Sequence, residues 1–131
     1  MREEGFTEAD RKERALLLGV DLHDGEDFAR SMEELKSLAE ACGMEAVGQV
    51  VQNLPKLHHA LYMGKGKLLE VREELEEKSV DVLIFDRSLT PTQLRNLQEL
   101  LDFPILDRTT LILMIFAVRA KTREAKLQVE S

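Results

Sequence analysis

The residues best suited to a chemical role are basic, imidazole and aromatic side chains that lie close together in the sequence. Six of them occur within twelve residues, and no acid is present from position 53 to position 69. These six residues are Lys56, His58, His59, Tyr62, Lys65 and Lys67. Proteins hold phosphate backbones mainly with Lys and Arg, so this segment is a candidate RNA- or phosphate-binding site.

A second basic run lies near the end of the sequence. It consists of Arg119, Lys121, Arg123 and Lys126. Only Glu124 and Glu130 oppose this positive charge. The run is a second candidate for contact with phosphates, and its alternative interpretation is a solvated, charged helix face.

Gly64, Lys65, Gly66 and Lys67 resemble a phosphate loop, since glycines allow a close backbone approach and lysines add charge. They are the candidate nucleotide-binding residues if the chain is a stand-alone ATP- or GTP-binding module. However, no G-x-x-x-x-G-K-[ST] motif occurs in the sequence, and Leu69 follows where a dinucleotide fingerprint has another glycine. The alternative interpretation is a turn before a helix.

Other kinds of chemistry find little support in the residues. The histidines are His23, His58 and His59, and Cys42 is the single cysteine. None of them has a second His or Cys at the spacing of a metal site, and no Ser, His and acid set can be argued. We therefore predict no catalytic residues and no metal ligands in this chain.

Three aspartates, Asp21, Asp86 and Asp107, each follow a predicted strand, at the edge where parallel sheets bind ligands. A phosphoacceptor receiver domain also has acids at such positions, and a receiver-like switch is a further, weaker alternative. Leu22 stands where that class needs a second acid, and Arg108 follows the last strand in place of a lysine. The other interpretation is that these aspartates cap loops and helices.

Strands and helices alternate along the sequence, which is typical of a parallel sheet covered by helices. Ser31 with Glu34, and Thr90 with Pro91 and Gln93, indicate two helix starts. The expected strands are 15–20, 46–51, 80–85 and 104–106, and the expected helices are 31–42, 66–78 and 90–101. The predicted fold class is thus α/β, with a small, mainly parallel four-stranded sheet flanked by helices.

The final segment predicts one long helix from about Thr110 to the end, because no Gly or Pro interrupts it. It has no stop signal, and we expect it to be the first half of a helical hairpin. The predicted organisation is a flexible acidic leader at 1–13, an α/β domain at 14–109 and the long helix at 110–131.

The composition indicates a soluble globular chain, with 44% hydrophobic and 33% charged residues among 131. The net charge of −7 comes from residues 1–45, which hold 13 acids and 6 bases, so the remainder can meet a polyanion. The longest apolar run, Leu111 to Val118, is too short for a membrane span of roughly 20 residues. With no secretory signal visible, we expect a cytoplasmic protein.

Three stretches carry a resemblance to a known family. They are Tyr62 to Leu68 (YMGKGKL), Leu89 to Leu97 (LTPTQLRNL) and above all Asp107 to Glu130 (DRTTLILMIFAVRAKTREAKLQVE). The sequence from about Glu13 onward resembles the N-terminal region of the HflX family of translational GTPases.

The resemblance implies that the full-length protein continues through a helical hairpin into a G domain, which binds GTP and Mg²⁺ and hydrolyses GTP. It implies a large ribosomal subunit and its rRNA as partners, together with the protein's own G domain. This chain itself would bind no cofactor and would not be an enzyme. The exposed terminal helix could also cause a non-physiological dimer.

Overall fold

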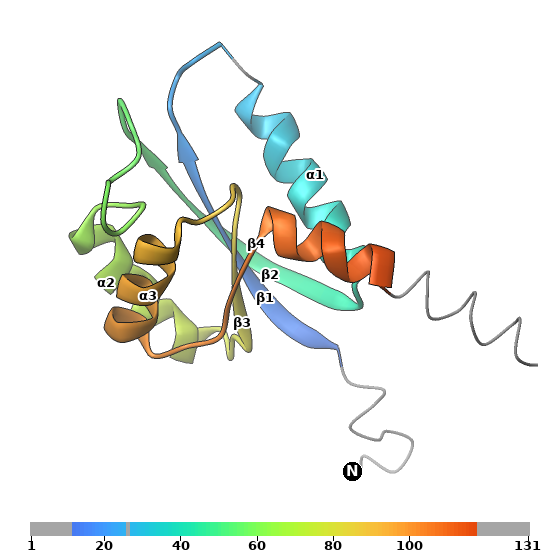
Figure 1. Cartoon of the computed structure of the whole chain (residues 1–131). Helices are drawn as coiled ribbons and strands as arrows, with labels where there is room; N and C mark the ends of the chain where they lie inside the picture. The colour runs from blue at the N-terminus through green and yellow to red at the C-terminus, as the bar shows by residue number, and fades with distance from the viewer. Residues whose placement is uncertain (1–11, 26, 118–131) are drawn as a thin grey trace, which may run out of the picture.

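The computed structural model describes residues 12–25 and 27–117. Its elements, in chain order, are β1 (Glu13–Asp21), α1 (Phe28–Ala41), β2 (Met44–Asn53), α2 (Lys65–Glu77), β3 (Val82–Phe85), α3 (Pro91–Leu101) and β4 (Ile105–Asp107), followed by a helix over 108–117. The predicted alternation of strands and helices is confirmed (Figure 1).

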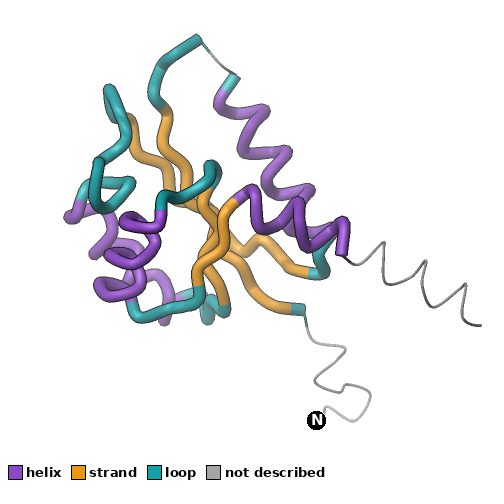
Figure 2. The backbone as a smooth tube through the Cα atoms, viewed as in Figure 1, coloured by secondary structure: helices purple, strands orange, loops and turns teal. Residues whose placement is uncertain are grey.

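The four strands form one parallel sheet in the order β2-β1-β3-β4. The chain therefore moves from β1 to one side, crosses back and continues on the other side. Since parallel crossovers are right-handed, this reversal puts α1 on one face of the sheet and α2 and α3 on the other (Figure 1, Figure 2). The helix 108–117 lies on the α1 face. The predicted parallel α/β class is confirmed.

Side chains of the central strand β1 alternate between two hydrophobic layers. Leu16, Leu18 and Val20 are buried in the layer beneath α2 and α3. Ala15 and Leu17 are buried in the layer beneath α1 and the helix 108–117. This burial on both faces explains why residues 15–20 form a continuous apolar run in the sequence.

Gly19 allows α1 to approach the sheet closely. A Cβ atom at this position would lie 2.6 Å from Sδ of Met32 and 2.9 Å from Cζ of Phe28. Both residues belong to α1, so the absence of a side chain on β1 sets the distance at which this helix packs.

Several predicted boundaries differ from the structure. The helix α1 begins at Phe28, with Asp27 as its N-cap, and not at Ser31. The last described helix begins at residue 108, two residues before the predicted start. The predicted leader before residue 12 and the predicted continuation of this helix to residue 131 lie outside the described residues.

No helix in the described part of the chain is both long and apolar enough to cross a membrane.

Candidate functional site

A cavity of about 510 Å³ opens at the carboxyl ends of β1 and β3, where the strand order reverses. Open α/β sheets bind ligands at this type of position. Its lining combines five carboxylates with three guanidinium groups. The carboxylates belong to Asp21, Asp24, Asp27, Glu34 and Asp86, and the guanidinium groups belong to Arg30, Arg87 and Arg108.

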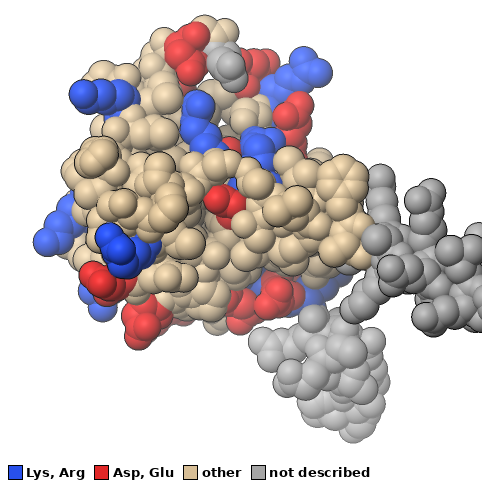
Figure 3. Space-filling model, in the orientation of Figure 1, with Lys and Arg blue, Asp and Glu red and all other residues tan. Residues whose placement is uncertain are grey.

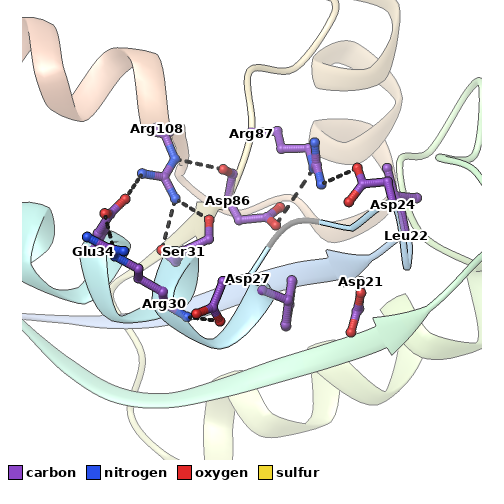
Figure 4. Close-up of a pocket in the computed structure, with 11 residues that line it drawn as sticks. Asp21, Leu22, Asp24, Asp27, Arg30, Ser31, Glu34, Asp86, Arg87 and Arg108 are labelled. Carbon is purple, nitrogen blue, oxygen red and sulfur yellow. Dashed lines mark hydrogen bonds and ion pairs between the residues drawn. The ribbon is translucent and has the colours of Figure 1, made fainter.

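The two arginines nearest the sheet lie on either side of Asp86 (Figure 4). Arg108 donates from Nε to the Asp86 carbonyl oxygen at 2.9 Å, and from Nη2 to the hydroxyl of Ser31 at 2.8 Å. Arg87 lies within 3.9 Å of an Asp24 carboxylate oxygen and 4.0 Å of an Asp86 carboxylate oxygen. The protein's own groups therefore hydrogen-bond the Arg108 guanidinium, whereas the buried Nε of Arg87 has ion-pair neighbours but no hydrogen-bond partner. The excess of carboxylates disfavours a polyphosphate in this cavity.

Asp86 itself is buried and is hydrogen-bonded to the hydroxyl of Tyr62. Burial raises the pKa of the Asp86 carboxyl, although the Tyr62 hydroxyl and the Arg87 guanidinium act in the opposite direction. Burial also raises the pKa of the Tyr62 phenol, and the Asp86 charge raises it further. The pair thus joins the segment before α2 to the edge of the sheet. Asp86 lines the cavity but is only 3% exposed.

The other two strand-end aspartates cap local structure. The Asp107 carboxylate accepts hydrogen bonds from the backbone N–H of Leu89 and from the N–H and hydroxyl of Thr110. The Asp21 carboxylate accepts one from the N–H of His23. The interpretation as caps is confirmed for Asp21 and Asp107, whereas Asp86 accepts from the Tyr62 side chain instead.

The segment between β2 and α2 forms an ordered loop, which we call the basic loop and define as residues 54–64. His58 and Tyr62 form an isolated antiparallel bridge within it. From α3, Nε2 of Gln93 donates to the His58 carbonyl oxygen at 2.9 Å, and Nδ2 of Asn96 donates to the Ala60 carbonyl oxygen at 3.0 Å. The loop is therefore fixed both to α3 and, through Tyr62, to the sheet.

The predicted RNA-facing residues differ in how far they reach the surface. Lys56, His58, His59 and Lys65 are exposed. Lys67 is half-buried, with its ammonium 3.5 Å from a Glu70 carboxylate oxygen. Tyr62, which we expected among them, is fully buried, so it positions the loop. Arg119, Lys121, Arg123 and Lys126 lie outside the described residues.

The candidate nucleotide-binding residues, Gly64 to Lys67, are the N-cap and first turn of α2. The backbone N–H of Gly64 donates to Oε1 of Gln52 at 2.8 Å. A Cβ atom at Gly66 would meet no atom within 4 Å, so no close backbone approach requires that glycine. The segment therefore begins a helix, in agreement with its interpretation as a turn before a helix.

A groove of about 690 Å³ separates the basic loop from the beginning of α3. Lys56, His58 and His59 belong to its lining, and no carboxylate does. Sequence reasoning identified these three residues but not the groove, because its other wall comes from Thr90, Thr92 and Gln93. His59 and Thr90 are 31 residues apart in the sequence, and no local pattern indicates that they line the same groove.

No group of three or more His, Cys, Asp or Glu side chains within 12–25 and 27–117 is placed to hold a metal ion. The sequence also has no G-x-x-x-x-G-K-[ST] motif, the P-loop that wraps around a triphosphate.

Comparison with known proteins decides the family. The model of the family described as "GTP-binding GTPase N-terminal" matches residues 29–117. The chain belongs to this family. The relatives of this N-terminal domain confirm the resemblance to HflX: GTPase HflX of Lacrimispora saccharolytica is 44% identical over 119 residues, and GTPase HflX of Escherichia coli is 37% identical over 125 residues.

These alignments cover 91% and 95% of this chain but 28% and 29% of the two relatives. The chain thus spans less than a third of their length.

Solved structures show the same fold for this HflX-family domain. A variant of the protein SsGBP is 26% identical with a TM-score of 0.63, and the match covers 89% of this chain and 36% of that one. A GTP-binding protein from the archaeon Sulfolobus solfataricus, solved in complex with GDP, is 23% identical with a TM-score of 0.57. That match covers 80% of this chain and 30% of the other.

Proposed function

We propose that this domain binds rRNA of the large ribosomal subunit and thereby holds an HflX-type GTP-binding protein on the ribosome. GTP and Mg²⁺ are bound, and GTP is hydrolysed, in a G domain outside this chain. This chain acts as a binding platform in the cytoplasm and has no catalytic role of its own.

The observation that carries the proposal is the basic loop, which presents an exposed lysine and two exposed imidazole groups on a fixed backbone. Lys56, His58 and His59 project from a segment without acids, and α3 holds that segment at the His58 and Ala60 carbonyl groups. A preorganised loop loses little conformational freedom on binding, so its charges contribute more to affinity. Lys65 adds a further exposed charge at the start of α2.

Family membership supports the assignment of RNA binding to this domain and of GTP binding to a separate G domain. The relatives are named as GTPases, while this chain corresponds to under a third of their length. The basic run from Arg119 to Lys126 belongs to the proposed RNA-binding surface on its sequence alone.

The experiment is binding of this chain to purified large ribosomal subunits across a series of salt concentrations. We expect the logarithm of the association constant to fall linearly with the logarithm of salt concentration. Replacing Lys56, Lys65 and Lys67 by alanine should reduce the slope by about one for each lysine that contacts a phosphate. A second variant replaces Arg119, Lys121 and Arg123 by alanine.

The matched control is Lys36→Ala, which removes an exposed lysine from α1 on the opposite face of the sheet. It should leave the affinity and the slope unchanged. An absence of binding at low salt, or equal binding by the lysine variants, contradicts the proposal.

Nucleotide titration separates this proposal from a stand-alone nucleotide module. We expect calorimetry of this chain with ATP and with GTP to give no saturable heat, and a pure sample to hydrolyse GTP no faster than background. Saturable heat that disappears in a Lys65→Ala/Lys67→Ala variant would establish the nucleotide module instead.

A further inference from the structure

The Lys and Arg side chains on the surface of the domain are scattered, which favours a specific contact with RNA over contacts to its backbone alone. Figure 3 shows Lys and Arg side chains in separate small groups on a largely uncharged face, and not in one continuous basic patch. Few phosphates can therefore be neutralised at once from this side. An RNA partner held here needs contacts other than those to its backbone.

We propose that the groove between the basic loop and α3 receives an unpaired base of the bound RNA. This inference rests on the proposed function and specifies which part of the RNA the domain recognises. The occupant is a single nucleotide displaced from its neighbours, with its base in the groove and its phosphates beside Lys56.

The groove has the chemistry that a nucleobase needs. Leu54, Pro55 and Leu57 supply apolar surface for the faces of a planar ring. The imidazole rings of His58 and His59 supply flat groups of the kind on which unstacked bases pack in RNA complexes. Its volume of about 690 Å³ lies within the range of small-molecule sites.

Polar groups for the edge of a base are also available. Nδ1 of His58 accepts hydrogen bonds from the N–H groups of Ala60 and Leu61, at 3.3 Å and 3.1 Å. The neutral ring consequently carries its proton on Nε2, and this exposed residue offers a donor to a ligand. The exposed hydroxyl of Thr92 can donate or accept on the opposite wall.

Charge distinguishes this groove from the cavity at the ends of β1 and β3. Lys56 is the single formally charged residue in its lining, whereas five carboxylates line the cavity at the ends of β1 and β3. A nucleotide brings negative phosphates with its base, so it is attracted to the groove and repelled from the cavity.

Hydrogen bonds within the protein also fix the shape of the groove without a ligand. Gln93 is buried and bridges its two walls, since Oε1 accepts from the Thr90 N–H and Nε2 donates to the His58 carbonyl oxygen. Both walls are therefore fixed relative to each other, and a base can enter without first ordering the protein.

The test uses fluorescence anisotropy of this chain with uridine oligonucleotides of about ten nucleotides, a typical single-strand site size. One oligonucleotide is intact, one has abasic central positions that retain every phosphate, and one is paired into a duplex. We expect the intact single strand to bind about tenfold more tightly than the other two, as loss of one stacked base predicts.

A neutral substitution that fills the groove provides the second arm. Thr92→Leu enlarges a side chain in the lining, and Gln98→Leu makes a comparable exposed change on α3 outside it. Thr92→Leu should bind the intact and abasic strands equally weakly, with an unchanged salt slope, while Gln98→Leu behaves as the parent chain. Thermal unfolding monitors that both variants remain folded.

The outcomes separate this inference from the proposed function. Equal binding of intact and abasic strands, weakened by loss of Lys56 and Lys65, overturns the base site but keeps RNA anchoring. If neither the oligonucleotides nor large subunits bind, both proposals fail. Crosslinking gives two further tests. If 4-thiouridine in the intact strand crosslinks to α1 and not to the groove, the base site is overturned. It is also overturned if large subunits crosslink to the groove only through a ribosomal protein.

Discussion

At the scale of single residues, Tyr62 and Asp86 link the basic loop to the sheet. Tyr62 adopts a left-handed backbone conformation with φ of 71°, is fully buried, and packs edge-on against Phe85 with ring centroids 5.3 Å apart. A bulky residue in this conformation is uncommon and must be held by its surroundings. The hydrogen bond from its hydroxyl to Asp86 helps to hold Tyr62 in this conformation.

Removing that hydroxyl should destabilise the domain. Tyr62→Phe leaves a buried carboxylate without its donor, and we expect a loss of about 1–3 kcal/mol in the free energy of unfolding. Urea denaturation measures this. Because Asp86→Asn removes the charge that needs the donor, the Tyr62→Phe/Asp86→Asn double variant should lose less than the sum of the single variants. Strict additivity would show that the two side chains are not coupled.

The raised pKa of Asp86 predicts a pH dependence of stability. Between the ordinary value of 3.8 and its raised value, the folded state binds more protons than the unfolded state at this carboxyl. Its contribution to stability is therefore fully present in acid and is lost as pH rises through that interval.

Asp86→Asn should remove this term and keep an oxygen that can accept from Tyr62. The variant should gain stability relative to the parent chain as the pH is raised from about 4 to about 7, measured by urea midpoints. Parallel curves for the two proteins would contradict the prediction. Glu99→Gln, a neutralised exposed carboxylate on α3, serves as the control.

At the scale of elements, helix starts show how far local sequence patterns reach. Thr90, Pro91 and Gln93 predicted the start of α3, and the structure has the complete capping box there. The same kind of pattern at Ser31 was wrong, because Asp27 caps α1 and the Ser31 hydroxyl accepts from Arg108. A residue 77 positions away decides the role of Ser31, and no local pattern contains that information.

Asp107 caps the start of the helix 108–117, and its pKa allows a prediction about that cap. Burial alone would raise the pKa of its carboxyl, but hydrogen bonds from Leu89 and Thr110 outweigh burial and lower the pKa below 3.8. The stability that this group contributes is thus present at neutral pH and lost as pH falls through the lowered value.

Asp107→Ala should therefore cost about 1–2 kcal/mol of unfolding free energy at neutral pH, as the loss of a helix cap does. The difference from the parent chain should shrink as the pH falls below about 4. Chemical denaturation at several pH values measures it, with Glu99→Ala as the exposed-carboxylate control. A difference that stays constant down to acid pH would show that the carboxylate charge is not what stabilises the cap.

At the scale of the whole molecule, alternation of elements was sufficient to predict a parallel sheet, but not its strand order. That order depends on which faces the helices cover, and it creates the cavity between β1 and β3. The groove likewise depends on contacts such as Gln93 to His58, between residues 35 apart. The sequence thus identified Lys56, His58 and His59 as candidates, while the surface that surrounds them arises only on folding.

The helix 108–117 presents an exposed apolar surface to the outside of the molecule. Leu111 is buried against the sheet, but Ile112, Leu113 and Phe116 are 38%, 60% and 60% exposed. Exposed apolar groups of this size close together are typical of surfaces that are covered in an assembly. We expect this chain to self-associate through them.

Sedimentation velocity over a range of protein concentrations tests this expectation. The parent chain should show a concentration-dependent rise in sedimentation coefficient, and Leu113→Glu/Phe116→Glu should remain monomeric, because burying two carboxylates at the interface is strongly unfavourable. Both substituted positions are exposed, so unfolding free energy at low concentration should be nearly unchanged. Glu33→Leu, which adds an apolar residue to an exposed site on α1, should not alter association. A parent chain that is monomeric at all concentrations would mean that this apolar face does not by itself drive association.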